Sequence, residues 1–152
     1  MVLKKGLVSN YLNLETQLQP NGFDLTVRSV GRFTSSGVID FDNSQRRLPD
    51  IEVEHKTVLM PGAYSVDFNE KISLPADLMG ICVHRSSVMR CGAAAVCGFF
   101  DAGYSGFGKT LLTVYNPNGL VLMANARVSQ MVFFRLNPVS EGYRGHYQHE
   151  GE

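Results

Sequence analysis

Short runs of β-branched and aromatic residues, separated by turn-forming residues, dominate the middle and the end of this chain. The clearest runs lie at residues 63–68, 79–83, 110–116, 120–123 and 127–136. Turn formers lie between them, namely PG at 61–62, LPAD at 74–77, DAGYSGFG at 101–108 and NPNG at 116–119. Runs of this composition between turns are typical of short strands. Their spacing predicts an all-β sandwich, barrel or jelly roll.

Helix is expected in only two places: residues 7–14, and a turn beginning near Ser86 or Ser87, either of which could cap it. The chain has 152 residues and a hydrophobic content of 44%, enough for one domain with a substantial core. We therefore expect a single domain over residues 1–152. Its tail, from about residue 141, is polar without an apolar face, so we expect it to be flexible or to become ordered on binding.

The charge balance limits the class of partner. Fourteen basic and fourteen acidic residues cancel, so no global field would hold duplex nucleic acid or an anionic membrane. The three cysteines, Cys82, Cys91 and Cys97, match no zinc-binding spacing and fit a reducing compartment. No secretory signal is evident, and no window approaches the ~18 apolar residues of a membrane span. A cytoplasmic protein is expected, with neither nucleic acid nor membrane as partner.

The segment HRSSVMR, residues 84–90, could bind an anion. Arg85 and Arg90 can donate forked hydrogen bonds to phosphate oxygens, while Ser86 and Ser87 offer hydroxyls and backbone N–H groups. A capped surface helix with two solvated arginines is an equally good interpretation of these residues alone. The chain has no Walker-type glycine-rich loop, which argues against a P-loop nucleotidase.

The segment GFFDAGYSG, residues 98–106, places an acid where a strand gives way to a glycine-rich turn. There Asp101 could reach a bound water and act as a general base. The ring of Tyr104, three residues later, could pack against a sugar or a base. Ordinary hairpin chemistry explains the same residues if they are considered alone.

Four stretches, taken in order, resemble the motifs of the trimeric dUTPase and dCTP deaminase superfamily. QPNGFDLTV (19–27) is similar to the first motif, with Asp24 in its acidic position, and HRSSVMRCG (84–92) to the second. GFFDAGYSG resembles the third, and ARVSQMVFF (126–134) the fourth, with Gln130 in its glutamine position. The resemblance covers most of the chain after residue 18, and the ordered set is far more specific than any single motif.

This resemblance implies a distorted β-barrel or jelly roll of the dUTPase-like β-clip type. It also implies a homotrimer with each nucleotide site at a subunit interface. In a dUTPase, the residue matching Asp101 activates the water that attacks the α-phosphate of dUTP, releasing dUMP and pyrophosphate. In this family, magnesium is bound by the triphosphate and otherwise mostly by water. Asp24 is therefore expected to be at most an indirect partner of the metal, through water.

The resemblance also assigns the substrate contacts. The pyrimidine is read by backbone groups around Cys97, Gly98 and Phe100, and Tyr104 lies under the deoxyribose. Arg85, Ser86, Ser87, Arg90 and Gln130 fall on the phosphate side. The tail segment YRGHYQ, residues 143–148, looks like the C-terminal Tyr…Lys-Tyr-Gln segment of the deaminases, with histidine in place of lysine. The lid residues implied by this match are Tyr143, His146, Tyr147 and Gln148.

One position separates the two activities. Family deaminases resemble one another in a glutamate on the strand after the third motif, and the matching residue here is Thr113. A threonine hydroxyl cannot shuttle protons as that carboxyl does at neutral pH. The sequence therefore predicts a dUTPase of the deaminase-like branch. A dCTP deaminase or a bifunctional enzyme forming dUMP from dCTP, and a non-catalytic nucleotide-binding regulatory trimer, are the alternatives.

Overall fold

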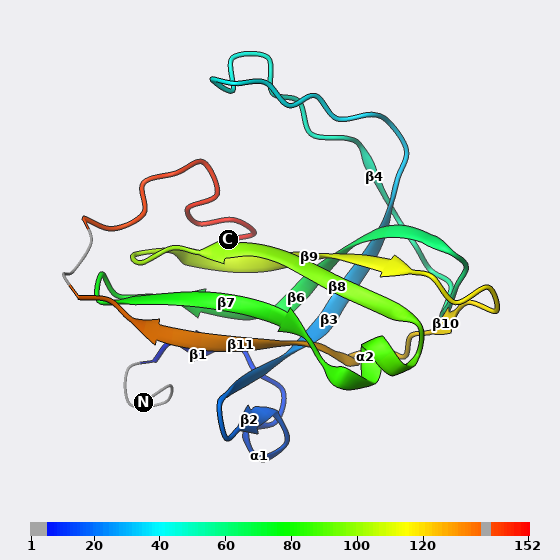
Figure 1. The fold of residues 1–152 in the computed structure, drawn as a ribbon, viewed down its shortest axis with the longest axis horizontal. Helices are drawn as coiled ribbons and strands as arrows, with labels where there is room; N and C mark the ends of the chain where they lie inside the picture. Colours follow the sequence, from blue (N-terminus) through cyan, green and yellow to red (C-terminus); the bar gives the residue numbers. More distant parts are fainter. Residues whose placement is uncertain (1–5, 138–140) are drawn as a thin grey trace.

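A closed β-barrel forms the body of the protein in a computed structural model, which describes residues 6–137 and 141–152 (Figure 1). Antiparallel pairing runs through β6, β9, β8, β7, β11 and β3, and the ring closes because β3 also pairs with β6. The barrel strands are β3 (Gly22–Phe33), β6 (Gly62–Ser73), β7 (Leu78–His84), β8 (Ala93–Phe100), β9 (Ser105–Val114) and β11 (Arg127–Arg135). The prediction of an all-β barrel is confirmed.

Smaller elements surround the barrel. They are β1 (Val8–Ser9), α1 (Leu14–Gln17), β2 (Leu18–Gln19), β4 (Ile51–Val53), β5 (Val58–Leu59), α2 (Ser86–Arg90) and β10 (Leu120–Val121). The helix expected at residues 7–14 is wrong, because Val8 pairs with Ile72 as a strand and α1 begins only after Asn13. The Asn13 side chain accepts a hydrogen bond from the Thr16 backbone N–H at 2.9 Å, which caps α1.

The second predicted helix is present as α2, but no serine caps it. Its N-cap residue is Arg85, which makes no side-chain capping hydrogen bond. The buried side chain of Val88 anchors the helix to the core instead. The turn expected at residues 101–108 is shorter than predicted, because β9 already begins at Ser105.

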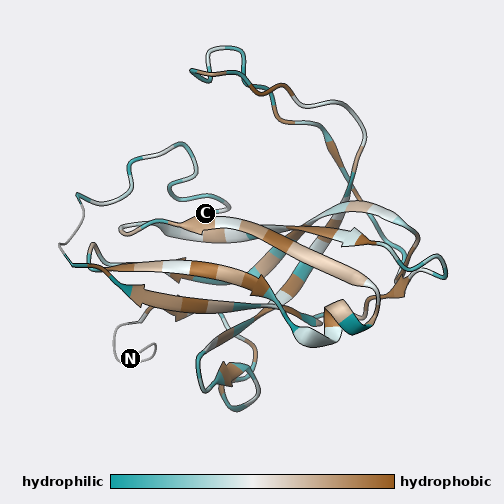
Figure 2. Ribbon diagram, viewed as in Figure 1, coloured by the Kyte–Doolittle hydropathy of each residue, from teal (hydrophilic) through white to brown (hydrophobic). Residues whose placement is uncertain are grey.

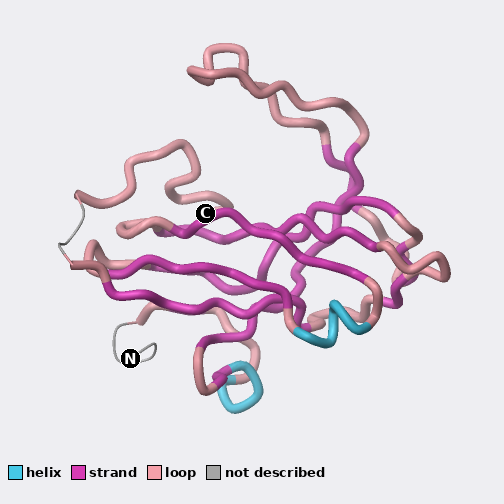
Figure 3. Tube along the Cα trace, in the orientation of Figure 1, coloured by secondary structure: helices cyan, strands magenta, loops and turns pink. Residues whose placement is uncertain are grey.

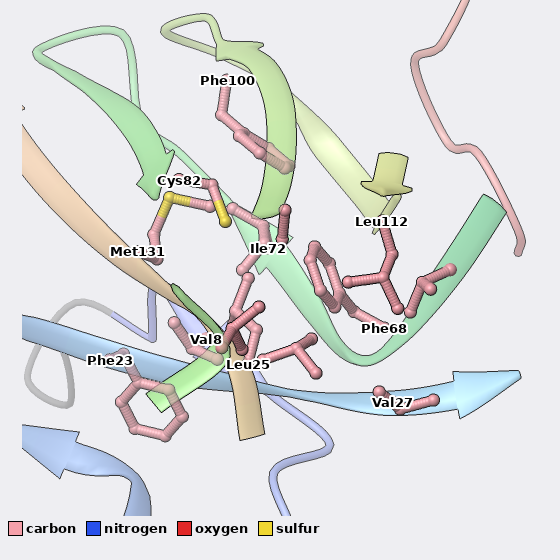
Figure 4. Close-up of a cluster of buried hydrophobic side chains, with 14 of the residues drawn as sticks. Val8, Phe23, Leu25, Val27, Phe68, Ile72, Cys82, Phe100, Leu112 and Met131 are labelled. Atoms are coloured by element: carbon pink, nitrogen blue, oxygen red, sulfur yellow. The ribbon is translucent and has the colours of Figure 1, made fainter. Parts of the chain in front are cut away.

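The core fills the barrel with side chains from alternate positions of its strands. Along β6, every second residue from Tyr64 to Ile72 is buried, as the two-residue period of a strand requires. Figure 4 shows Phe23, Phe68 and Met131 among the side chains of this hydrophobic cluster, and each is fully buried. Packing of this kind fixes the strand register, because a one-residue slip would turn the apolar side chains to solvent.

Two irregular segments project from the barrel, both drawn as loops in Figure 3. The arm, residues 34–50, joins β3 to β4, and its Ile39 and Phe41 side chains are exposed. Figure 2 shows hydrophobic stretches, coloured brown, within this projecting segment. An isolated bridge between Val38 and Arg47 holds its two sides together. The tail, residues 141–152, returns to the β8–β9 hairpin. Within the described residues, no helix has the length and apolarity that a membrane crossing requires.

Candidate functional site

The hairpin of β8 and β9 opens toward its tip. The two strands pair from Ala93–Val114 to Val96–Leu111, and no ladder pair joins them beyond that point. Across β7, Cys97 and Gly98 together occupy the register interval opposite Cys82, which is a β-bulge. The bulge redirects the end of β8 away from β9. This leaves a wedge-shaped space between the strands, in which backbone N–H and C=O groups can form hydrogen bonds with a planar ring.

A pocket of about 630 Å³ lies at this opened hairpin, a size suited to a small-molecule ligand. Hairpin residues form one side, and the arm, β4 and the tail form the others. It is lined by Phe33, Leu48, Pro49, Ile51, Gly98, Phe99, Phe100, Asp101, Tyr104, Gly108, Lys109, Tyr143, Tyr147 and Glu150. Six of the predicted site residues are thus brought together. Sequence reasoning missed the apolar walls from the arm and β4, and also Lys109, because no motif marks them.

Asp101 and Tyr104 are held in one turn of the pocket. The Tyr104 backbone N–H donates to the Asp101 carbonyl over 3.0 Å, and Gly103 between them takes a positive φ of 85°. The Asp101 side chain is exposed, so its carboxylate can meet water and substrate. Burial raises the pKa of Tyr104 to about 12, so its phenol stays neutral at physiological pH. The turn therefore places an exposed carboxylate beside an uncharged and largely buried ring that lines the pocket.

A second cluster surrounds Asp24, which is fully buried. Its Oδ2 lies 2.9 Å from Arg85 Nε and 3.2 Å from Arg127 Nη1, while Gln130 Nε2 donates to Oδ1 over 3.3 Å. Burial raises the pKa of the Asp24 carboxyl, and the two guanidinium groups oppose that shift. The carboxylate therefore fixes two arginines and a glutamine in one place. Arg127 was missed by the sequence analysis, although it lies within the fourth motif.

Within a single chain, the predicted phosphate-side residues are separate from the pocket. Arg85, Ser86, Ser87, Arg90 and Gln130 are absent from its lining, as is Cys97. Ser86, Ser87 and Arg90 are exposed on α2.

The donor groups near Asp24 limit how the expected Mg²⁺ ion could be held. Among the described residues, no group of three or more histidine, cysteine, aspartate or glutamate side chains could hold a metal ion. The oxygens of Asp24 already accept from two arginines and a glutamine, so this buried carboxylate does not suit direct ligation. The geometry around Asp24 therefore leaves it suited at most to an indirect contact with Mg²⁺, through water.

The tail lies along the pocket turn, at the positions expected for a lid. The Tyr143 backbone N–H donates to the Ala102 carbonyl over 2.6 Å, and Oε1 of Gln148 accepts from the Ser105 N–H over 3.1 Å. The rings of His146 and Tyr147 pack edge to face with centroids 5.4 Å apart, and the Arg46 guanidinium lies over Tyr147. The predicted lid residues therefore gather on the Asp101 side of the molecule.

The β-barrel, the pocket beside Asp101 and the cluster around Asp24 are together typical of a nucleotide-binding protein. Comparison with known proteins gives its family. A family model described as dCTP deaminase-like matches residues 3–136, and the chain belongs to that family. A relative from Archaeoglobus fulgidus, named "probable deoxyuridine 5'-triphosphate nucleotidohydrolase", is 45% identical over 153 residues, covering 99% of this chain and 91% of the relative.

Two solved structures share the fold. The dCTP deaminase of Agrobacterium tumefaciens matches with a TM-score of 0.65 at 20% identity, over 90% of this chain and 46% of the deaminase. The present chain thus spans about half the length of that enzyme. A mutant dUTPase from phage phi11 of S. aureus, described with a structural Mg(II) ion, matches with a TM-score of 0.52 at 12% identity, over 91% and 95% of the two chains.

Proposed function

We propose that the protein is a dUTP diphosphatase, which hydrolyses dUTP to dUMP and pyrophosphate. The observation that carries this proposal is the placement of the exposed Asp101 carboxylate beside Tyr104, at the mouth of an opened β8–β9 hairpin. The name of the A. fulgidus relative, which this chain matches over nearly its full length, supports the same activity. Uracil would bind in the wedge between β8 and β9, and the deoxyribose would pack against Tyr104. The carboxylate of Asp101 would bind and activate the water.

The reaction follows from these positions. Asp101 accepts a proton from a water molecule as the water oxygen attacks the α-phosphorus. The bond from that phosphorus to the bridging oxygen breaks, and pyrophosphate leaves with the electron pair. When bound to the triphosphate, Mg²⁺ neutralises charge on its oxygens. The guanidinium groups of Arg85 and Arg127, already oriented by Asp24, are suited to hold the phosphates.

Deamination is disfavoured by the surroundings of Thr113. This residue pairs with Ala63 of β6 and with Ala94 of β8, so neither neighbouring strand places a carboxyl directly opposite it. Replacing the C4 amino group of cytosine needs a group that both accepts and returns a proton. Neither this hydroxyl nor its two alanine partners supplies one.

The proposal includes a homotrimer whose sites combine residues of different subunits. An exposed apolar row crosses three strands, because Val83 pairs with Val96 and Val96 with Leu111. Their exposed fractions are 46%, 59% and 41% in the single chain. Assembly would bury this row and would allow the Asp24–Arg85 cluster of one subunit to meet the Asp101 pocket of another.

A product assay tests the function. The purified protein is incubated with Mg²⁺ and with dUTP, dCTP or dTTP, and ammonia, nucleoside monophosphate and pyrophosphate are measured. We expect dUMP and pyrophosphate from dUTP and no ammonia from dCTP. Asp101→Asn should keep nucleotide affinity while turnover falls by about 10²–10⁴. Ammonia release would establish a deaminase, and an inert wild type that binds dUTP would establish the regulatory trimer instead.

A further inference from the structure

The ring of Tyr104 is packed between two other aromatic rings, one of which comes from the tail. Its centroid lies 5.4 Å from that of Phe100 with the planes at 82°, and 5.9 Å from that of Tyr143 at 62°. Both are edge-to-face contacts, which favour a particular mutual orientation of the rings. Phe100 belongs to β8 and is fixed by the barrel. The other side of Tyr104 is fixed only when the tail is seated.

The tail also holds the backbone on both sides of Tyr104. The Gln148 side chain donates from Nε2 to the Gly103 carbonyl over 3.0 Å, and its Oε1 accepts from the Ser105 N–H at 3.1 Å. A single amide thus bonds to both sequence neighbours of Tyr104. The His149 N–H adds a bond of 2.7 Å to the Ser105 carbonyl. These contacts restrain the turn that carries the ring.

Glycines in both segments provide the room for this seat. A Cβ at Gly103 would lie 2.8 Å from the Tyr143 backbone nitrogen, and one at Gly106 would lie 2.9 Å from the Glu150 nitrogen. Within the tail, a Cβ at Gly145 would overlap the Tyr143 hydroxyl. Contacts closer than 3.0 Å cannot be accommodated without displacement of the tail backbone. The close approach of tail and turn therefore requires glycine at positions 103 and 106, while Gly145 leaves room for the Tyr143 side chain within the tail.

We infer that Tyr143 and Gln148 are positioning residues for Tyr104, so that the seated tail sets the discrimination between deoxyribonucleotides and ribonucleotides. This inference rests on the proposed function, in which the sugar packs on the Tyr104 ring. It gives Gln148 a role beyond that of a lid residue, because both ends of its amide are bonded to the turn.

Discrimination of this kind is sensitive to small displacements. UTP differs from dUTP by one hydroxyl, and a closely packed apolar surface rejects an added hydroxyl by only about 10²-fold. A ring that is free to tilt away from the sugar would admit the extra oxygen. Loss of either tail contact should therefore reduce the preference for dUTP, and should do so mainly by improving the relative use of UTP.

The experiment compares kcat/KM for dUTP and for UTP in the full-length protein. Tyr143→Leu removes the ring, and Gln148→Met removes both hydrogen bonds while keeping the length of the side chain. Each should lower the dUTP-to-UTP ratio by about tenfold. Tyr143→Phe keeps the ring and should retain the wild-type ratio. Tyr147→Leu is the matched control, because Tyr147 lies in the same tail and the same pocket but packs on His146 and Arg46.

The outcomes separate this inference from the proposed function. If Tyr143→Leu and Gln148→Met slow both substrates equally, the tail acts only as a cover and the inference is wrong. A drop in the ratio with Tyr147→Leu equal to that with Tyr143→Leu would also overturn it, since the effect would then belong to the tail as a whole. Failure of the wild type to hydrolyse dUTP would instead reject the proposed function. Affinities for the α,β-imido analogues of dUTP and UTP would in that case still test the Tyr143 contact.

Discussion

Arg85 donates from Nε to Oδ2 of Asp24 over 2.9 Å, and the accepting carboxylate is fully buried. The same guanidinium donates from Nη1 to the Arg127 carbonyl over 3.3 Å. Two of the nitrogens of the Arg85 guanidinium are thus held by hydrogen bonds within the barrel, while about a quarter of the side chain is still exposed. A guanidinium held in this way is pre-oriented for a phosphate group.

The Asp24–Arg85 pair should also contribute to folding stability. Arg85→Ala leaves a buried carboxylate with one guanidinium fewer, so we expect a loss of about 2 kcal/mol in the free energy of unfolding. The double variant Asp24→Asn/Arg85→Ala should cost at least ~1 kcal/mol less than the sum of the two single changes. Urea denaturation measures all three. Strictly additive costs would contradict the pairing, and exposed Arg90→Ala, expected within ~0.5 kcal/mol of wild type, is the control.

Mixed assembly tests whether one active site uses two subunits. If the protein forms the proposed homotrimer, the Asp101→Asn and Arg85→Ala variants should each be nearly inactive on dUTP when assembled alone. After co-refolding at equal amounts, roughly a quarter of the sites would combine an intact Asp101 from one subunit with an intact Arg85 from another. Activity should therefore reappear on mixing, as measured by pyrophosphate release. A mixture that stays as inactive as its parts would place both residues in the site of one subunit.

The sequence predicted the barrel because several of its strands show the expected pattern. Strands β6, β7 and β9 alternate between interior and exterior, so their residues indicate both strand and face. Strand β3 was not predicted, since its first six residues are all buried and include Asp24 and Thr26. A strand covered on both sides by the same fold loses the alternation that local pattern reading depends on.

Site residues that are close together in the sequence could be predicted from their motifs. Contacts between site residues far apart in the sequence could not. Asp101 and Tyr104 are three residues apart, so one turn places them together whatever the rest of the chain does. Asp24 meets Arg127 across 103 residues, and only the pairing of β3 with β11 joins them. For the same reason, the sequence alone could not show that two arginines surround the Asp24 carboxylate.

Two pocket glycines should respond differently to an added methyl group. A Cβ at Gly108 would lie 2.7 Å from Cζ of Phe100, whereas a Cβ at Gly98 would meet nothing within 4 Å. We expect Gly108→Ala to cost about 1–3 kcal/mol in the free energy of unfolding through overpacking. Gly98→Ala should stay within ~0.5 kcal/mol of wild type. If uracil enters the wedge, however, the methyl group at position 98 should raise KM for dUTP, whereas an unchanged KM would argue against this binding mode.

A buried carboxyl joins the N-terminal segment to the barrel. The carboxyl is that of Glu70, which is fully buried. Its Oε1 accepts from Gln17 Nε2 and Thr26 Oγ1, both at 2.6 Å, and its Oε2 accepts from the Thr26 N–H at 2.8 Å. Burial raises the pKa of Glu70 above its ordinary value of 4.5, against the opposing effect of these donors.

This raised pKa predicts a specific pH dependence of stability. Between the ordinary value of 4.5 and the higher folded-state pKa of Glu70, the folded protein binds more protons than the unfolded chain. The contribution of Glu70 to stability therefore falls as pH rises through that window, and it is constant above it. Glu70→Gln abolishes this slope. It also places an amide N–H₂ against donors, so it should lower the free energy of unfolding by about 1–3 kcal/mol at pH 7. Urea denaturation of wild type and Glu70→Gln from pH 4 to pH 8 measures the difference in their free energies of unfolding.

This difference should be larger at the acid end, where wild-type Glu70 is protonated and stabilised. A difference that shrinks on acidification would show that the carboxyl is charged throughout and that the three donors outweigh burial.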